Sequence, residues 1–236
     1  MVNRIVIRRS IACRCKRIMD LKEKVEKVKA EAAAHGAKVV AATKYLDIEG
    51  TKKIIEAGIT ELGENRADMF LEKYEALKDY NVKWHFFGVV QSRKVRDLVN
   101  RIDCLHTLDR LSIAMEFDKR LEKPLDCFVQ VNISDEPNKS GVTLSKVKPL
   151  IKSLSKCSKI RVIGLMCIAR LTNDEEELAR SFKKMQDMKE EVEEMGLEYA
   201  PCHELSMGMS NDYRIALQYG STLIRIGSKF TKYINK

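Results

Sequence analysis

A lysine and an arginine at opposite ends of this sequence could do chemistry. Lys44 closes the short apolar run Lys38–Lys44 (KVVAATK), and Arg225 lies between two isoleucines. A primary amine can form a Schiff base with an aldehyde, and a guanidinium can donate hydrogen bonds to an anion or a ring nitrogen. Two simpler interpretations stay open: Lys44 as a solvated surface lysine, and Arg225 as the partner of Glu64 or Glu204 in a structural ion pair.

Two loops of small residues could hold a phosphate. They read SMGMS at 206–210 and Gly227-Ser228. Small residues let backbone N–H groups approach an anion, and Ser210 precedes an expected helix, whose N-terminus attracts phosphate. Gly208 and Gly227 could also be ordinary turn glycines. Together, however, the lysine, the arginine and the two loops are the parts of a pyridoxal phosphate (PLP) site.

The surrounding elements predict how these parts would meet. Apolar runs typical of strands alternate with helical patterns along the chain. Strict alternation implies parallel strands, and eight of them in 236 residues predict a TIM-type (β/α)8 barrel of the α/β class. A doubly wound sheet would need a GxGxxG loop after its first strand, and none is present. The expected strands are 38–44, 61–65, 83–88, 104–108, 127–133, 161–167, 203–207 and 223–227; the expected helices are 20–35, 47–57, 67–80, 91–101, 109–121, 144–154, 174–195 and 211–219.

In such a barrel the carboxyl ends of all strands meet at one mouth, and phosphate is held after the seventh and eighth strands. Lys44 and both small-residue loops fall at these ends. Strand alternation places Arg225 on the same face as Gly227 and opposite its isoleucine neighbours, hence toward the interior.

The charge is concentrated at the start of the chain. The 43 basic and 34 acidic residues give a net charge of +9, and six of the basic residues lie in 1–19, which leaves 37 against 34. We expect a basic extension at 1–19, either a transit peptide or an untranslated stretch with Met19 as the true start. We expect one domain at 20–236. A nucleic-acid platform is a weak third interpretation, because no aromatic stripe accompanies the charge.

The seven cysteines indicate a reducing compartment. They are scattered, apart from one CxC, and no secretory signal is present, so free thiols and a cytoplasmic location are expected. Cys104, Cys127 and Cys167 fall in expected strands and are interpreted as core residues. No metal site and no membrane span are expected.

Several short motifs occur in a fixed order, and with them the chain resembles the pyridoxal phosphate homeostasis protein family, a single-barrel relative of alanine racemase (PLP fold type III without the extra β-domain). The motifs are AATK (41–44), LGEN (62–65), WHFFG (84–88), QVNIS (130–134), KSG (139–141), GLM (164–166), LSMGMSND (205–212) and IRIGS (224–228). The resemblance covers residues 21–230. The sequence departs from the family pattern at Arg66, Val89, Val90 and Arg93 and in Lys-Phe-Thr after Ser228.

The resemblance implies a role for each matched residue. Lys44 would be the Schiff-base lysine, and Arg225 would lie near the ring nitrogen of PLP. Contacts to the phosphate are implied for Ser210, Gly227 and Ser228, and the cofactor would be lined by Asn65, His85 and Met207.

The expected function is that of a carrier. An arginine at the ring nitrogen makes PLP a poorer electron sink. The sequence ends a few residues after the eighth expected strand, so the second catalytic domain of racemases is not expected. We therefore expect a monomeric protein without robust catalysis that holds PLP as a lysine aldimine, takes part in PLP homeostasis and supplies apo PLP-dependent enzymes. The alternative is an amino-acid racemase of narrow scope. Lys139, in the loop after the fifth strand, could accept the aldehyde during transfer.

Overall fold

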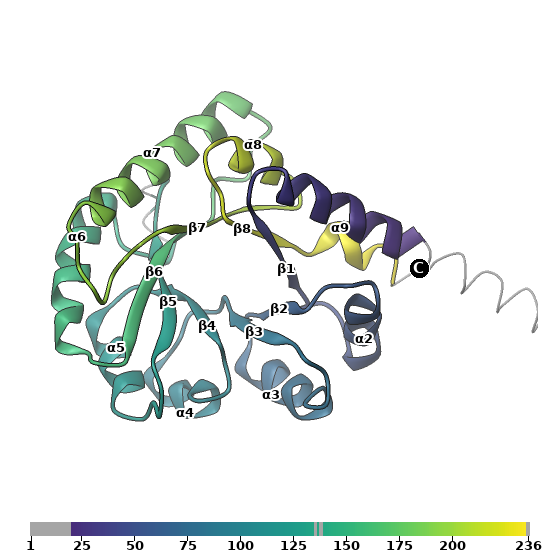
Figure 1. Ribbon diagram of the computed structural model, residues 1–236, viewed down its shortest axis with the longest axis horizontal. Helices are drawn as coiled ribbons and strands as arrows, with labels where there is room; N and C mark the ends of the chain where they lie inside the picture. The colour runs from purple at the N-terminus through teal and green to yellow at the C-terminus, as the bar shows by residue number, and fades with distance from the viewer. Residues whose placement is uncertain (1–19, 135, 137–138, 235–236) are drawn as a thin grey trace, which may run out of the picture.

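Eight parallel strands close into a barrel, with each strand hydrogen-bonded to its neighbours in chain order and β8 paired with β1 (Figure 1). The computed structural model describes residues 20–134, 136 and 139–234. The predicted (β/α)8 barrel is confirmed. The strands are β1 Lys38–Ala42, β2 Glu61–Glu64, β3 Lys83–Phe86, β4 Cys104–Leu108, β5 Leu125–Val131, β6 Ile160–Cys167, β7 Glu204–Met209 and β8 Leu223–Ile226.

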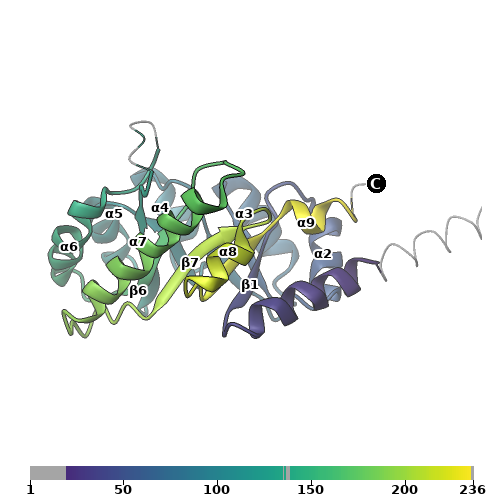
Figure 2. The same ribbon diagram turned by 90° about the horizontal axis from the view of Figure 1, so that it is seen from above.

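Helices surround the strands, and α7 and α8 lie along the outside of β7 (Figures 1 and 2). Before β1 stands a helix over residues 20–33. The others are α2 Ile48–Glu56, α3 Ala67–Ala76, α4 Val95–Leu98 after a 3₁₀ turn at Ser92–Lys94, α5 Leu111–Asp118, α6 Leu144–Ser153, α7 Glu175–Glu193, α8 Tyr213–Gln218 and α9 Ser228–Thr231.

Local sequence signals explain several helix ends. Asp47 caps α2 by accepting a hydrogen bond from the Gly50 N–H at 2.7 Å, as predicted, and Asp174 caps α7. The helix expected at 91–101 is shorter in the structure. Its first residues form the 3₁₀ turn, and the backbone leaves the helix at Val99, whose ψ is 137°, before turning at Asn100, whose φ of 60° is left-handed.

The helix at residues 20–33 is amphipathic as predicted, and its apolar residues Leu21, Val25, Val28 and Ala32 are buried. Glu31 fixes it to α8 by accepting hydrogen bonds from Tyr213 and Arg214. The Arg214 guanidinium lowers the pKa of Glu31 to about 2.

The core has two layers. The larger fills the space between the strands and the helices, and the smaller lies inside the barrel and consists of Val40, Cys104, Phe128, Met166 and Leu223. The cysteines interpreted as core residues are buried free thiols. Burial raises the pKa of the Cys167 thiol to about 12 and that of Cys104 well above its usual value.

In the described part of the chain no helix is long and apolar enough to cross a membrane. The expectation of a basic extension at 1–19 concerns residues outside those described.

Candidate functional site

The first and last strands bring Lys44 and Arg225 to the same end of the barrel. Val40 pairs with Arg225 in the β1–β8 ladder, and Lys44 lies four residues further along, just beyond the carboxyl end of β1. Alternation puts Lys44 on the face of Val40, which points into the barrel. Lys44 is exposed, and its Nζ lies 4.9 Å from the centre of the Tyr45 ring. The amine is therefore open to a ligand entering the mouth.

Arg225 is buried with 5% of its surface exposed, and it faces the barrel interior. Its Nη1 donates to the carbonyl and the hydroxyl of Ser206 at 2.7 and 2.6 Å, and its Nη2 donates to the Cys167 carbonyl at 2.8 Å. Its guanidinium carbon lies 5.9 Å from the centre of the Phe87 ring. Burial lowers the pKa of Arg225, yet a guanidinium remains protonated at neutral pH. Arg225 is thus a fixed cation beneath the mouth.

The ion-pair alternative for Arg225 is wrong for the described residues, none of which places a carboxylate within ion-pair distance of this guanidinium. Glu64 pairs with Lys73 at 2.5 Å instead, on the side of the strands that faces the helices. Glu204 lines a cavity at the amino ends of the strands, the end opposite the mouth.

The two predicted phosphate loops meet. Ser210 Oγ lies 3.3 Å from both the Gly227 N–H and the Lys229 N–H, each of which donates to it. Lys229 Nζ also donates to the Ser210 carbonyl at 2.8 Å. Gly227 sits beside β1, and an added Cβ would lie 3.3 Å from the Ala42 carbonyl oxygen. Backbone N–H groups, a hydroxyl and an ammonium so close together suit a phosphate.

The remaining predicted residues are placed differently from one another. Asn65 and Ser228 are exposed and directly follow β2 and β8, so both lie at the mouth. His85 lies deeper in the barrel, with its ring nitrogens hydrogen-bonded to Glu61 and His106. Met207 is fully buried in the layer between strands and helices. The structure therefore gathers Asn65 and Ser228 with Lys44, while the side chains of His85 and Met207 point elsewhere.

A buried set of charges holds the β1 and β2 ends in place behind the mouth. Lys73 Nζ, on α3, donates to the Thr43 carbonyl at 2.8 Å and to Glu64 Oε1 at 2.5 Å, and Thr43 Oγ1 donates to the same carboxylate at 2.6 Å. All three residues are fully buried. Because Lys44 follows Thr43 directly, this set positions the candidate amine from behind.

Known proteins that resemble this chain indicate its family. A family model described as the alanine racemase N-terminal domain matches residues 13–233. The pyridoxal phosphate homeostasis protein of Aquifex aeolicus is 34% identical over 221 residues, covering 91% of this chain and 95% of the relative. That of Schizosaccharomyces pombe is 35% identical, with 83% and 84% covered. This chain belongs to the pyridoxal phosphate homeostasis protein family. The resemblance drawn from the motifs is confirmed.

Solved structures of other proteins show the same fold. PipY of Synechococcus elongatus superposes with a TM-score of 0.83 at 27% identity, covering 89% of this chain and 99% of PipY. A second PipY structure, with PLP bound, gives 0.81 at 25% identity. Alanine racemase from Corynebacterium glutamicum gives 0.69 at 15% identity and is covered over 59% of its length, which is a likeness of fold alone.

No individual role was predicted for three polar residues near the mouth. Ser206 and Lys229 contact Arg225 and Ser210 as described above, and Gln130 Oε1 is buried without a hydrogen-bond partner among the described residues. Ser206 stands two positions before Gly208 in the predicted loop, so strand alternation could have shown that it points inward. Lys229 follows Ser228 directly, but no pattern marks its amide as part of the cradle.

Proposed function

We propose that this protein binds PLP reversibly through Lys44 and takes part in intracellular PLP homeostasis and supply, without robust catalysis of its own. One observation carries the proposal. The amine of Lys44, the buried cation of Arg225 and the cradle of Ser210, Gly227 and Lys229 belong to one barrel mouth, in a chain of the PLP homeostasis family. The amine suits the aldehyde, the cradle suits the phosphate, and Arg225 suits the ring nitrogen.

The chemistry of Arg225 favours holding PLP over using it. When bound, PLP supplies an aldehyde and an electron-accepting ring. Arg225 is a permanent hydrogen-bond donor, so it would leave the ring nitrogen unprotonated and the ring a weaker electron acceptor. Its donors are also held by the carbonyls of Ser206 and Cys167, which fixes the guanidinium in one orientation. Carbanion chemistry is therefore disfavoured at this site.

Racemisation would need a second base across the ring from Lys44, and the Cys167 thiol, which packs in the layer between the strands and the helices, is unsuited to that role. The carbonyl of Cys167 accepts a hydrogen bond from Arg225, so this residue lies beneath the mouth. Burial raises the pKa of its thiol to about 12, so at neutral pH the thiol keeps its proton and cannot accept another.

The rim of the mouth suits delivery of PLP to other enzymes. Most of the large apolar side chains exposed in the described residues lie in segments at or just after strand ends: Tyr45, Val89, Ile168, Leu171 and Met209. Apolar side chains grouped around a binding site are typical of surfaces that contact another protein. We propose that apo PLP-dependent enzymes are the partners, that the protein acts as a monomer in the cytoplasm, and that the single barrel domain of residues 20–236 suffices for this role.

The test compares the purified protein with the Lys44→Ala variant. The unchanged protein should absorb near the Schiff-base band and gain the mass of reduced PLP after borohydride treatment, and the variant should show neither. Lys53→Ala, which removes a lysine from α2, is the matched control. An unchanged band and mass in Lys44→Ala would exclude Lys44 as the anchor. Exchange of a substrate α-hydrogen in deuterated water, faster than with free PLP, would favour a racemase.

A further inference from the structure

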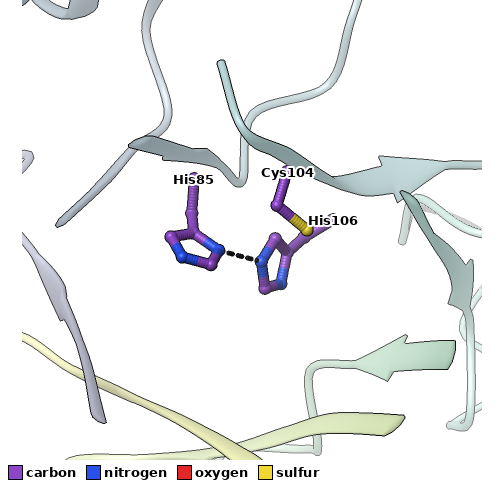
Figure 3. Close-up of side chains that lie close together, drawn as sticks. All are labelled: His85, Cys104 and His106. Carbon is purple, nitrogen blue, oxygen red and sulfur yellow. Dashed lines mark hydrogen bonds between the residues drawn. The ribbon is translucent and has the colours of Figure 1, made fainter. Parts of the chain in front are cut away.

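A cluster of two histidines and a cysteine lies inside the barrel, below the mouth. One nitrogen of each imidazole and the Cys104 sulfur lie within 4.8 Å of one another (Figure 3). Their closeness follows from the strands: Cys104 and His106 are two residues apart on β4 and so share a face, and His85 on β3 pairs with Cys104. Within the described residues this is the one such group of three possible metal ligands.

The outer nitrogen of each imidazole is already engaged. His85 Nε2 lies 2.8 Å from Glu61 Oε2, and His106 Nδ1 lies 2.9 Å from Ser206 Oγ. The inner nitrogens, His85 Nδ1 and His106 Nε2, face each other at 2.8 Å (Figure 3). Histidines that bind metals generally hydrogen-bond a carboxylate or another acceptor through the nitrogen that does not bind the metal. The arrangement here has this form on both rings.

Without a cation, the same atoms can form a one-way chain of hydrogen bonds. Arg225 donates to Ser206, the Ser206 hydroxyl donates to His106 Nδ1, His106 Nε2–H donates to His85 Nδ1, and His85 Nε2–H donates to Glu61. Both imidazoles are then neutral. This chain has no place for the Cys104 thiol, which takes part in none of the hydrogen bonds among the described residues.

A cavity reaches the cluster from the end opposite the mouth. It has a volume of about 450 Å³ and opens at the amino ends of the strands. Both His85 and Cys104 line it, together with Glu61 and Glu204. A cation could therefore enter from solvent without passing the mouth, and a water molecule in the cavity could complete its coordination.

We propose that His85, Cys104 and His106 form a binding site for one Zn²⁺-class cation. The ligands are His85 Nδ1, His106 Nε2 and Cys104 Sγ, with the fourth, open position facing the cavity. Mixed imidazole and thiolate ligands select zinc-class ions over Mg²⁺ or Ca²⁺, which prefer oxygen. Tetrahedral bonds of about 2.05 Å to nitrogen and about 2.3 Å to sulfur require nitrogens about 3.3 Å apart and a sulfur about 3.6 Å from each. The two nitrogens now lie 2.8 Å apart and the three candidate ligand atoms within 4.8 Å of one another, so the side chains must shift when the cation binds.

Binding is balanced in protons and in charge. His106 moves its proton from Nε2 to Nδ1 and donates it to Ser206, which frees the Nε2 lone pair for the cation. Cys104 loses its proton to solvent, so each cation that binds releases one proton. The cation and the thiolate together carry one positive charge, and the Glu61 carboxylate bonded to His85 offsets it. This compensation lowers the cost of holding an ion inside the barrel.

The test is titration of the reduced, full-length protein with Co²⁺, a spectroscopic substitute for Zn²⁺. Cys13 and Cys15 are first replaced by serine, so that this CxC pair cannot supply the thiolate. We expect a thiolate-to-cobalt absorption band that saturates at one equivalent and disappears on addition of Zn²⁺. Cys104→Ser should abolish the band, and Glu61→Gln should weaken binding about 10- to 100-fold. Cys127→Ser, at another buried strand cysteine, is the matched control and should keep the band.

Two measurements keep the outcome decisive. Calorimetry of the Cys13→Ser/Cys15→Ser protein in buffers of different ionisation enthalpy should show one proton released per Zn²⁺, whether or not the Cys104 and Glu61 variants fold. With PLP removed from both proteins, Lys44→Ala and the parent should bind Co²⁺ equally, because Lys44 lies at the mouth, so this proposal can fail independently of PLP binding. The absence of a stoichiometric band, its persistence in Cys104→Ser or the absence of Zn²⁺ binding by calorimetry would overturn the site and leave the neutral hydrogen-bond chain.

Discussion

Replacing Lys73 by methionine removes the cation from the buried set behind Lys44. Lys73 and Glu64 are both fully buried, and the carboxylate would keep only its hydrogen bond from Thr43. Its Oε2 already lacks a hydrogen-bond partner among the described residues, so no local group is positioned to take over from the lysine. The variant therefore leaves an uncompensated charge inside the protein.

The expected loss is large. Removing one partner of a buried ion pair costs about 3–5 kcal/mol, out of a total stability of about 5–15 kcal/mol for a typical domain. For a chain of this size about 2–4 °C of Tm is lost per kcal/mol, so Tm should fall by about 6–20 °C. The double variant Glu64→Leu/Lys73→Met removes both charges, and Thr43 Oγ1 keeps the Gly63 carbonyl as an acceptor at 3.3 Å. It should recover at least half of the loss.

The assay is urea unfolding at neutral pH of the unchanged protein, both single variants and the double variant, which closes a double-mutant cycle. Lys183→Met, which breaks the exposed pair of Lys183 with Asp187, is the control and should change stability by less than about 0.5 kcal/mol. A loss below about 1 kcal/mol in Lys73→Met, or strictly additive losses in the double variant, would refute the reasoning. PLP content should fall with stability, because Thr43 directly precedes Lys44, the proposed anchor.

Three further predictions follow from single contacts. Ser210→Ala should weaken PLP binding on the order of 10- to 100-fold, because it removes a hydrogen bond to a charged group. Ser155→Ala is the control and should have no effect. Equal PLP affinities of Ser210→Ala and the parent in titrations would count against the cradle. Glu31→Gln should lower Tm at pH 7. Folding depresses the pKa of Glu31 to about 2, so the stability that this carboxylate contributes is complete above the unfolded pKa near 4.5 and is lost as pH falls from about 4.5 to 2. The difference in Tm between variant and parent should therefore close over that range, and a difference independent of pH would contradict this. Leu171→Ser, at an 88% exposed rim residue, should slow transfer of PLP to an apo-enzyme several-fold and leave the PLP content unchanged. Met115→Ser on α5 is the control. Equal transfer rates for Leu171→Ser and the parent would show that the rim takes no part in transfer.

The parts of the fold set by local periodicity could be predicted from the sequence. The alternation of apolar strands with amphipathic helices predicted the barrel, and the alternation of side chains along a strand predicted that Arg225 points inward. Where single backbone torsions decide, the prediction was less accurate: α4 ends early because the chain becomes extended at Val99 and turns at Asn100, which apolar spacing does not reveal. The ion-pair partners could not be predicted from the sequence either, because the pairing of Glu64 with Lys73 depends on how α3 packs against β2.

Backbone position could be predicted for the candidate site residues. Lys44, Ser210 and Gly227 lie at the same end of the barrel, because the carboxyl ends of parallel strands meet there; their contacts with PLP stay a prediction. Inside the barrel, the direction of a side chain depends on the neighbouring strands. The family motif predicts that His85 lines the cofactor at the mouth, but its ring nitrogens face Glu61 and His106. The pair Cys104 and His106, two apart on one strand, was a local signal that could have indicated a cluster. The third member, His85, lies on β3 and is brought beside Cys104 by the register between β3 and β4, which the sequence of a single strand does not reveal.

Ser206 connects the two proposed sites, because its hydroxyl contacts both Arg225 and His106. In the neutral chain this hydroxyl donates to His106; with a cation bound below, it must accept from His106 and Arg225 together. Bound PLP and a bound cation would therefore each change the hydrogen bonding of the other site through Ser206. Equilibrium linkage then requires that PLP change the affinity for Zn²⁺ by the same factor as Zn²⁺ changes the affinity for PLP. If both affinities change by the same factor in the parent protein and neither changes in Ser206→Ala, this hydroxyl is the point of coupling. If neither affinity changes in the parent protein, the two sites bind independently.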